Sequence, residues 1–102
     1  HVESEGQASA LTFELAQNFP NPFNPTTTIA YRVSQASNVS LMIYNVLGQR
    51  VRSLVKAEYS AGLYHMIWDG QDGAGHDVAS GVYVAQLVAD ERKMVQMLAL
   101  VR

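Results

Sequence analysis

The stretch GLYHMIW at residues 62–68 alternates between two sets of side chains. Every second position carries a large, mainly apolar residue: Tyr64, Met66 and Trp68. A period of two is typical of a β-strand that buries one of its faces. We therefore expect this set to face a core, and His65, on the other side of the strand, to point to solvent.

Short runs with the same alternation occur along the whole chain. They predict strands at residues 11–16, 26–33, 39–45, 50–55, 62–68, 81–89 and 94–101. Turn-forming residues separate the runs, such as Gly48 at 45–49, which can adopt a positive φ. In the last run both alternating sets are apolar, so its inward face stays open. About seven short strands with turns between them predict an all-β fold, an Ig-like antiparallel β-sandwich.

Residues 17–25, QNFPNPFNP, contain all three prolines of the chain. Proline fixes φ near −65° and disfavours a helical conformation of the residue before it, so this segment is not a helix. We expect Phe19 and Phe23 to anchor the segment with their rings. Asn21 and Asn24 are expected to close turns with their side chains. The prediction is a stiff crossover between strands.

Length and composition narrow the function. The 102 residues fit a linker at residues 1–10, which are small and polar, and one domain at residues 11–102. A net charge of −2 with scattered cations argues against a nucleic-acid partner. The absence of cysteine excludes disulfides and thiolate chemistry. No transmembrane segment is expected, because no apolar run approaches the roughly 18 residues that a membrane helix needs. The first residue is His1, so we expect any export signal to lie upstream.

Few residues suggest chemistry. Asp69, Asp72 and Asp77 lie in a glycine-rich loop and could bind calcium. Their spacing departs from the EF-hand pattern, so we favour carboxylates that cap their own backbone, and we expect no metal and no cofactor. His65 and His76 lack metal-ligand spacing and are interpreted as surface residues.

Catalysis is not supported by any pattern in the chain. No serine lies in a G-x-S-x-G elbow, and no pair of acidic residues has a reason to converge. We therefore predict a domain that is not an enzyme. An aromatic platform for sugars, built from Trp68, Tyr64 and Tyr83, is a second possibility, although a core position is favoured for Trp68.

Four blocks in order over residues 17–102 carry a resemblance to a known family. They are NFPNPFNPTT at 18–27, VSLMIYNVLGQ at 39–49, the segment from Gly62 through WDG at 68–70 to Asp72 and Gly75, and ASGVY at 79–83 followed by RKM at 92–94. The chain resembles the type A C-terminal sorting domain of the Bacteroidetes-type type IX secretion system. The fold of this class is related to the Ig-like domain of the flagellar hook-capping protein. One departure is that the chain continues through residues 96–102, which leaves the pairing of the last strand open.

The resemblance implies a sorting and anchoring role. Such a domain directs an upstream passenger from the periplasm to the cell surface. The implied partners are an outer-membrane translocon, a shuttle protein and a sortase-like peptidase that cuts upstream, here within residues 1–12. The recognition residues implied by the motif are Asn21, Pro22, Phe23, Asn24, Pro25, Gly48, Trp68, Asp69, Gly70, Gly81, Val82, Tyr83 and Lys93. The alternatives are an accessory carbohydrate-binding module and a structural Ig-like domain that spaces or caps.

Overall fold

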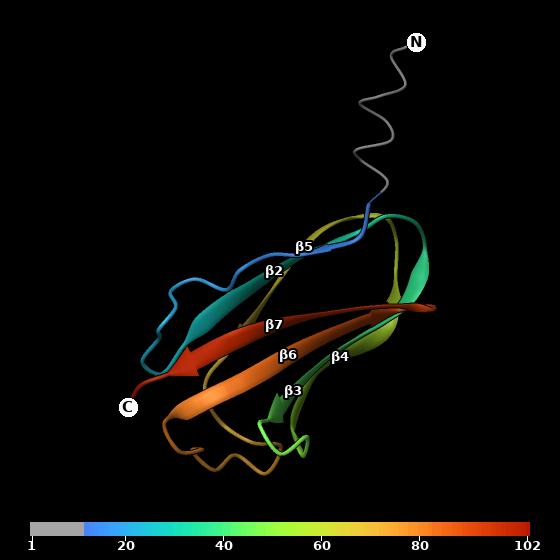
Figure 1. Ribbon diagram of the computed structural model, residues 1–102. Coiled ribbons are helices and arrows are strands. Elements are labelled where there is room, and N and C mark those ends of the chain that lie inside the picture. Colours follow the sequence, from blue (N-terminus) through green and yellow to red (C-terminus); the bar gives the residue numbers. More distant parts are fainter. Residues whose placement is uncertain (1–11) are drawn as a thin grey trace.

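The computed structural model of the chain describes residues 12–102 and places seven antiparallel strands in two sheets (Figure 1). The strands are β1 (Glu14–Leu15), β2 (Thr27–Val33), β3 (Ser37–Asn45), β4 (Arg50–Tyr59), β5 (Gly62–Trp68), β6 (Gly81–Ala89) and β7 (Arg92–Leu100). The order is β1-β2-β5 in one sheet and β4-β3-β6-β7 in the other. This confirms the predicted Ig-like antiparallel β-sandwich. The predicted linker at residues 1–10 lies outside the described residues.

The core lies between the two sheets and follows the alternation of the sequence. The inward residues of β2, β3, β5 and β6 that are fully buried include Ile29, Leu41, Ile43, Trp68 and Ala85. Burying each large side chain contributes roughly 1.5–3 kcal/mol of stability relative to exposure. As expected, His65 is exposed, whereas Trp68 on the opposite face of β5 is buried. In the described residues no helix is long and apolar enough to cross a membrane.

Several strand boundaries differ from the prediction. Of the first predicted strand, at residues 11–16, the part that the structure describes forms only the two residues of β1. β3 begins at Ser37, inside the predicted turn, and β4 continues to Tyr59, four residues beyond the predicted end. Both extensions have one cause: Ser37 pairs with Tyr59, so each strand stabilises the other beyond its own apolar run. β7 begins at Arg92, two residues before its predicted start, so only Asp90 and Glu91 lie between β6 and β7, with Asp90 at a φ of 55°.

The inward face of the last strand is resolved by its pairing with β6. Leu98 and Leu100 are buried, whereas Val95 and Met97 are 58% and 59% exposed. β7 pairs with β6 along its full length, from Gly81 with Leu100 to Ala89 with Arg92. The residues after Val95, which depart from the family pattern, therefore complete this hairpin.

The crossover at residues 17–26 connects the two sheets at the edge of β7. The Phe23 N–H donates to the Ala99 carbonyl at 2.9 Å, and the Val101 N–H donates to the Phe23 carbonyl at 2.9 Å. Asn21 Oδ1 accepts from the Ala99 N–H at 3.0 Å. In Figure 1 this segment reaches the end of β7 after leaving β1 in the opposite sheet. The crossover therefore closes one side of the sandwich.

Two expectations about the crossover are wrong. Phe23 is 2% exposed and anchors the segment, but Phe19 is 79% exposed. Phe19 exchanges two backbone hydrogen bonds with Thr28, and this pairing turns its ring to the outer face of the three-stranded sheet. Asn21 caps the distant Ala99 instead of closing its own turn. One aromatic ring, that of Phe23, therefore anchors the crossover in the core.

The two rings make a matched test. Replacing Phe23→Ala removes a buried ring and leaves a cavity, so we expect a loss of about 3–5 kcal/mol in the free energy of unfolding. Phe19→Ala should change it by no more than about 0.5 kcal/mol, because the ring is exposed. Urea denaturation followed by tryptophan fluorescence measures both. Equal losses would contradict the single-anchor interpretation.

Candidate functional site

The predicted recognition residues gather at one end of the sandwich. The crossover, the turn at residues 45–49, the loop at residues 69–80 and residues 101–102 all lie there, because β2, β4 and β6 start at this end and β3, β5 and β7 finish there. Lys93 is the exception, since it lies near the start of β7 at the opposite end. This end of the molecule is the candidate functional site.

An aromatic cluster forms the floor of the site. The Trp68 ring lies 5.7 Å from the Phe23 ring and 5.3 Å from the Tyr83 ring, centroid to centroid, the latter edge to face. Such pairs contribute about 0.5–1.5 kcal/mol beyond their area burial. Trp68 Nε1 donates to the Gln71 carbonyl at 2.9 Å, and the Tyr83 hydroxyl donates to the Ala79 carbonyl at 2.6 Å. The cluster therefore also holds both ends of the loop at residues 69–80.

The aromatic residues do not form a sugar-stacking platform. Trp68 is 0% exposed and Tyr83 is buried, so neither presents a ring face to solvent. Tyr64 lies at the other end of the sandwich, where its ring contacts Tyr31 at 5.7 Å and Tyr59 at 4.5 Å. Burial, with Tyr59 as a further cause, raises the pKa of Tyr31 in that second cluster. The core position favoured for Trp68 is confirmed.

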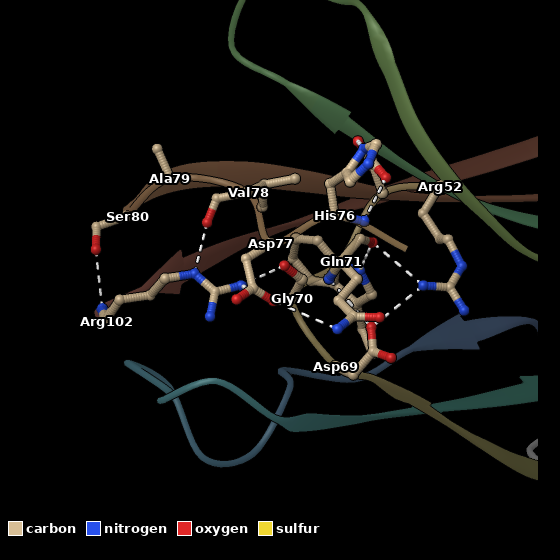
Figure 2. Close-up of polar contacts among 12 residues, drawn as sticks. Arg52, Asp69, Gly70, Gln71, His76, Asp77, Val78, Ala79, Ser80 and Arg102 are labelled. Carbon is tan, nitrogen blue, oxygen red and sulfur yellow. Dashed lines mark hydrogen bonds and ion pairs between the residues drawn. The ribbon is translucent and has the colours of Figure 1, made fainter. Parts of the chain in front are cut away.

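Arg52 fixes the first part of the loop (Figure 2). Its Nη1 donates to Asp69 Oδ1 at 3.2 Å and to the Gln71 carbonyl at 3.2 Å. Asp69 Oδ1 also accepts from the Gln71 N–H at 3.1 Å. One carboxylate oxygen thus joins a strand of the four-stranded sheet to the turn that follows β5.

Asp72 caps the tip of the loop. Its Oδ1 accepts from the Ala74 N–H at 2.9 Å and from the His76 N–H at 3.0 Å. These bonds, with that from His76 the strongest cause, lower the pKa of Asp72 below its ordinary value of 3.8. The His76 ring is 79% exposed, with Nδ1 3.7 Å from Asp72 Oδ2. Both histidines therefore lie at the surface.

Arg102 closes the other side of the loop (Figure 2). Its Nε donates to the Val78 carbonyl at 2.6 Å, its Nη2 donates to the Gly70 carbonyl, and its backbone N–H donates to Ser80 Oγ at 2.8 Å. Gly70 has a φ of +75°, and a Cβ there would lie 2.8 Å from Arg102 Nη2 and 3.1 Å from the Pro25 carbonyl oxygen. Glycine is therefore required where the crossover, the loop and residue 102 meet.

The three aspartates of the loop do not converge. Asp69 and Asp72 accept from backbone N–H groups, which confirms their predicted capping role. Asp77 accepts instead from Gln71 Nε2 at 3.3 Å and lies 3.6 Å from Arg102 Nη2. Among residues 12–102, no three His, Asp or Glu side chains are placed to hold a metal ion. The aspartates therefore organise the surface of the loop.

Most of the predicted recognition residues stabilise this end of the fold. Phe23, Trp68 and Tyr83 are buried in the cluster, and Pro25 contacts Gly70. Gly48, at a φ of 82°, forms the turn whose Val46 and Leu47 side chains are exposed. Pro22 and Asn24 are exposed parts of the crossover, and Gly81 opens β6 at a φ of 155°, which residues with a side chain rarely adopt. Val82 is partly exposed on the outer face of the four-stranded sheet, which also carries Lys93.

Three residues of the site were not predicted from sequence. They are Arg52, Arg102 and Asn18, which is 1% exposed and donates through Nδ2 to Thr27 Oγ1 at 2.9 Å and to the Pro20 carbonyl at 3.3 Å. Asn18 is the first residue of the proline-containing block, and this position is the one feature of the sequence that could have indicated its structural role. The partners of both arginines depend on tertiary folding.

Removing the Arg102 side chain should loosen the loop. In Arg102→Ala the Val78 carbonyl loses its side-chain donor and the Gly70 carbonyl keeps only the Val78 N–H, so we expect faster amide hydrogen exchange across residues 70–80, with little change in β3. Arg102→Lys restores only part of the protection, because an ammonium lacks the planar fork. Arg50→Ala, on an exposed side chain of β4, is the control. Unchanged exchange in Arg102→Ala would refute this role.

The Asp72 cap should open in acid. A lowered pKa in the folded state means that the stabilisation is present above the ordinary value of 3.8 and is lost as pH falls through the folded-state pKa. We expect the Ala74 and His76 amide resonances to move together in an NMR titration with a midpoint below that of an unfolded peptide. Asp72→Asn should abolish this titration. A midpoint at or above the peptide value would disprove the assignment.

Comparison with known proteins agrees with this architecture. The sequence model of the FlgD Ig-like domain family matches residues 21–93. A search of curated proteins finds no match.

Three solved structures are similar to the chain. Dimeric latent PorU from Porphyromonas gingivalis has a TM-score of 0.69 at 20% identity, covering 88% of this chain and 9% of PorU. PorZ from the same organism, described as an essential bacterial surface component of its type-IX secretion system, has a TM-score of 0.57 at 26% identity, covering 95% of this chain and 12% of PorZ. FlgD from Xanthomonas campestris has a TM-score of 0.59 at 22% identity, covering 93% of this chain and 71% of FlgD.

The chain thus spans about a tenth of the length of PorU and PorZ. The Ig-like fold that it shares with them is typical of non-catalytic domains. Because the family match covers most of the folded domain, the chain belongs to the FlgD Ig-like domain family.

Proposed function

We propose that this domain is a type A C-terminal sorting domain, which directs an exported passenger protein through a type IX secretion system to the cell surface. The observation that carries the proposal is the similarity to PorZ, a surface component of such a system, over 95% of this chain and only 12% of PorZ. A domain that corresponds to a small part of a much larger protein is suited to be an appendage. The four motif blocks support the same function.

The domain acts by recognition without catalysis. Its partners in this proposal are the outer-membrane translocon, a shuttle protein and a sortase-like peptidase. It passes through the periplasm in a folded state and reaches the surface with its passenger. A rigid end of the sandwich, in which Asp69, Asp72 and Arg102 fix the loop, presents a constant shape to such partners.

A second candidate follows from the family itself. The match to the FlgD Ig-like domain and the 71% coverage of a FlgD structure favour a capping domain of a flagellar-type assembly. The two candidates differ in gene context, because a capping protein carries an assembly region next to this domain. The carbohydrate-binding alternative loses its main support, since Trp68 is buried.

Export of a reporter tests the proposal. The whole chain is fused behind a periplasmic reporter protein in a host with a type IX system, and surface exposure is measured by protease accessibility and antibody labelling of intact cells. We expect the reporter at the surface, whereas the same reporter fused to an unrelated Ig-like domain stays periplasmic. A fusion that is folded, by protease resistance in lysates, but remains periplasmic would overturn the proposal.

A further inference from the structure

The outer face of β6 and β7 is unusually apolar for the exposed side of an antiparallel sheet. One face of such a sheet is normally solvated and polar. Here the outward residues of the two strands are mostly apolar: Val82, Val84 and Val88 on β6, and Val95, Met97 and Ala99 on β7. Val82, Val95 and Met97 are 42%, 58% and 59% exposed. Contiguous apolar patches of this kind mark interaction sites.

The pairing register arranges these residues as a continuous field. Val82 lies opposite Ala99, Val84 opposite Met97, and Val95 opposite Gln86. Two shallow hollows adjoin the field. One is lined by Tyr44, Val46, Gly48 and Val84, next to the turn after β3, and the other by Asn38, Ser40, Lys56 and Val88. The field is therefore a broad surface with shallow hollows at its margins, and it is continuous with the exposed turn at residues 45–49.

Three cations border the field. Arg50, Tyr44, Val84 and Met97 form one row across the sheet, with Arg50 at its end. Lys56, Ser40, Val88 and Lys93 form another row, with a lysine at each end. Within residues 12–102 none of these cations has a carboxylate at ion-pair distance. Glu58 lies beyond the lysine row, opposite Asn38, and Asp90 lines the hollow that also contains Lys56 and Val88.

The charge on this face contrasts with that of the chain. The whole sequence has a net charge of −2, yet three cations border the field, and among residues 12–102 none of the three has a carboxylate within ion-pair distance. An apolar centre within a charged rim is the usual anatomy of a protein interface. A second copy of the chain fits poorly, because a two-fold interface places each patch on itself and sets cations against cations.

We propose that the outer face of β6 and β7 is the docking surface for a partner protein that presents an apolar patch bordered by aspartate and glutamate. The inference rests on the proposed function insofar as the partner is sought in the secretion machinery. Val82 and Lys93 are motif residues that lie outside the buried cluster, and the inference assigns both to one shared surface.

Substitutions on the two outer faces of the sandwich test the surface. Met97→Arg places a cation at the centre of the field, whereas Ile67→Arg places one on the outer face of β5 at a matched exposure of 60%. Both side chains are exposed, so both variants should unfold at the parental urea concentration. We expect surface delivery of the reporter to fall at least about tenfold in Met97→Arg and to change less than about twofold in Ile67→Arg. Lys93→Glu should also reduce delivery, and Lys93→Arg should retain it.

Direct contact is tested by photo-crosslinking in the same cells. A photoreactive amino acid replaces Val95 in one fusion and Ile67 in another, and the contact peptide of the adduct is identified by mass spectrometry. Support requires an adduct at Val95 and none at Ile67. The crosslinked peptide must be apolar and flanked by Asp or Glu, and the yield of the adduct must fall in Lys93→Glu. An adduct to a second copy of the fusion, to a lipid or to a peptide without acidic residues would overturn the inference.

The two proposals can fail separately. If the parental fusion is exported while Met97→Arg behaves like Ile67→Arg and Val95 gives no adduct, the docking surface is wrong and the sorting function stands. If the fusion stays periplasmic but Val95 still forms the specified adduct, the docking surface stands and the sorting function is wrong. Absence of both export and adduct refutes both.

Discussion

The structure depends on the way in which Phe23 joins the N-terminal crossover to the C-terminal strand β7. Its backbone forms hydrogen bonds with Ala99 and Val101 at the C-terminal end of β7, and its ring packs against Trp68 of the other sheet. One residue thus satisfies an exposed strand edge and fills the core between the layers. A sandwich with an uncovered edge would be open to unwanted strand pairing. The prolines on either side stiffen the segment that delivers Phe23 to this position.

The aromatic cluster extends this constraint to the candidate site. Because Trp68 and Tyr83 each donate a hydrogen bond to a carbonyl of the loop at residues 69–80, core packing also orders that loop. Arg52 and Arg102 then hold it from two sides. Much of the family motif is therefore explained by the construction of this end, whereas Val82 and Lys93 are motif residues on an exposed face that a partner can reach.

The sequence predicted the sandwich because the alternation of Tyr64, Met66 and Trp68, and of similar runs, reports directly which face is buried. It did not predict that β4 continues to Tyr59, because that extension comes from pairing with Ser37. The exposure of Phe19 was missed for the same reason, since its partner Thr28 sets its direction. Asn18, Arg52 and Arg102 acquire their partners across loops and sheets, and local patterns carry no information on such distant contacts.

The bond between Phe23 and residues 99–101 also fixes the order of events during synthesis. The crossover is made before β2, whereas the strand edge that receives it is made only after β6. A nascent chain that lacks this edge cannot form the backbone bonds of Phe23, so the two layers stay open on this side until β7 has been made. The sandwich therefore closes only when the whole domain has left the ribosome.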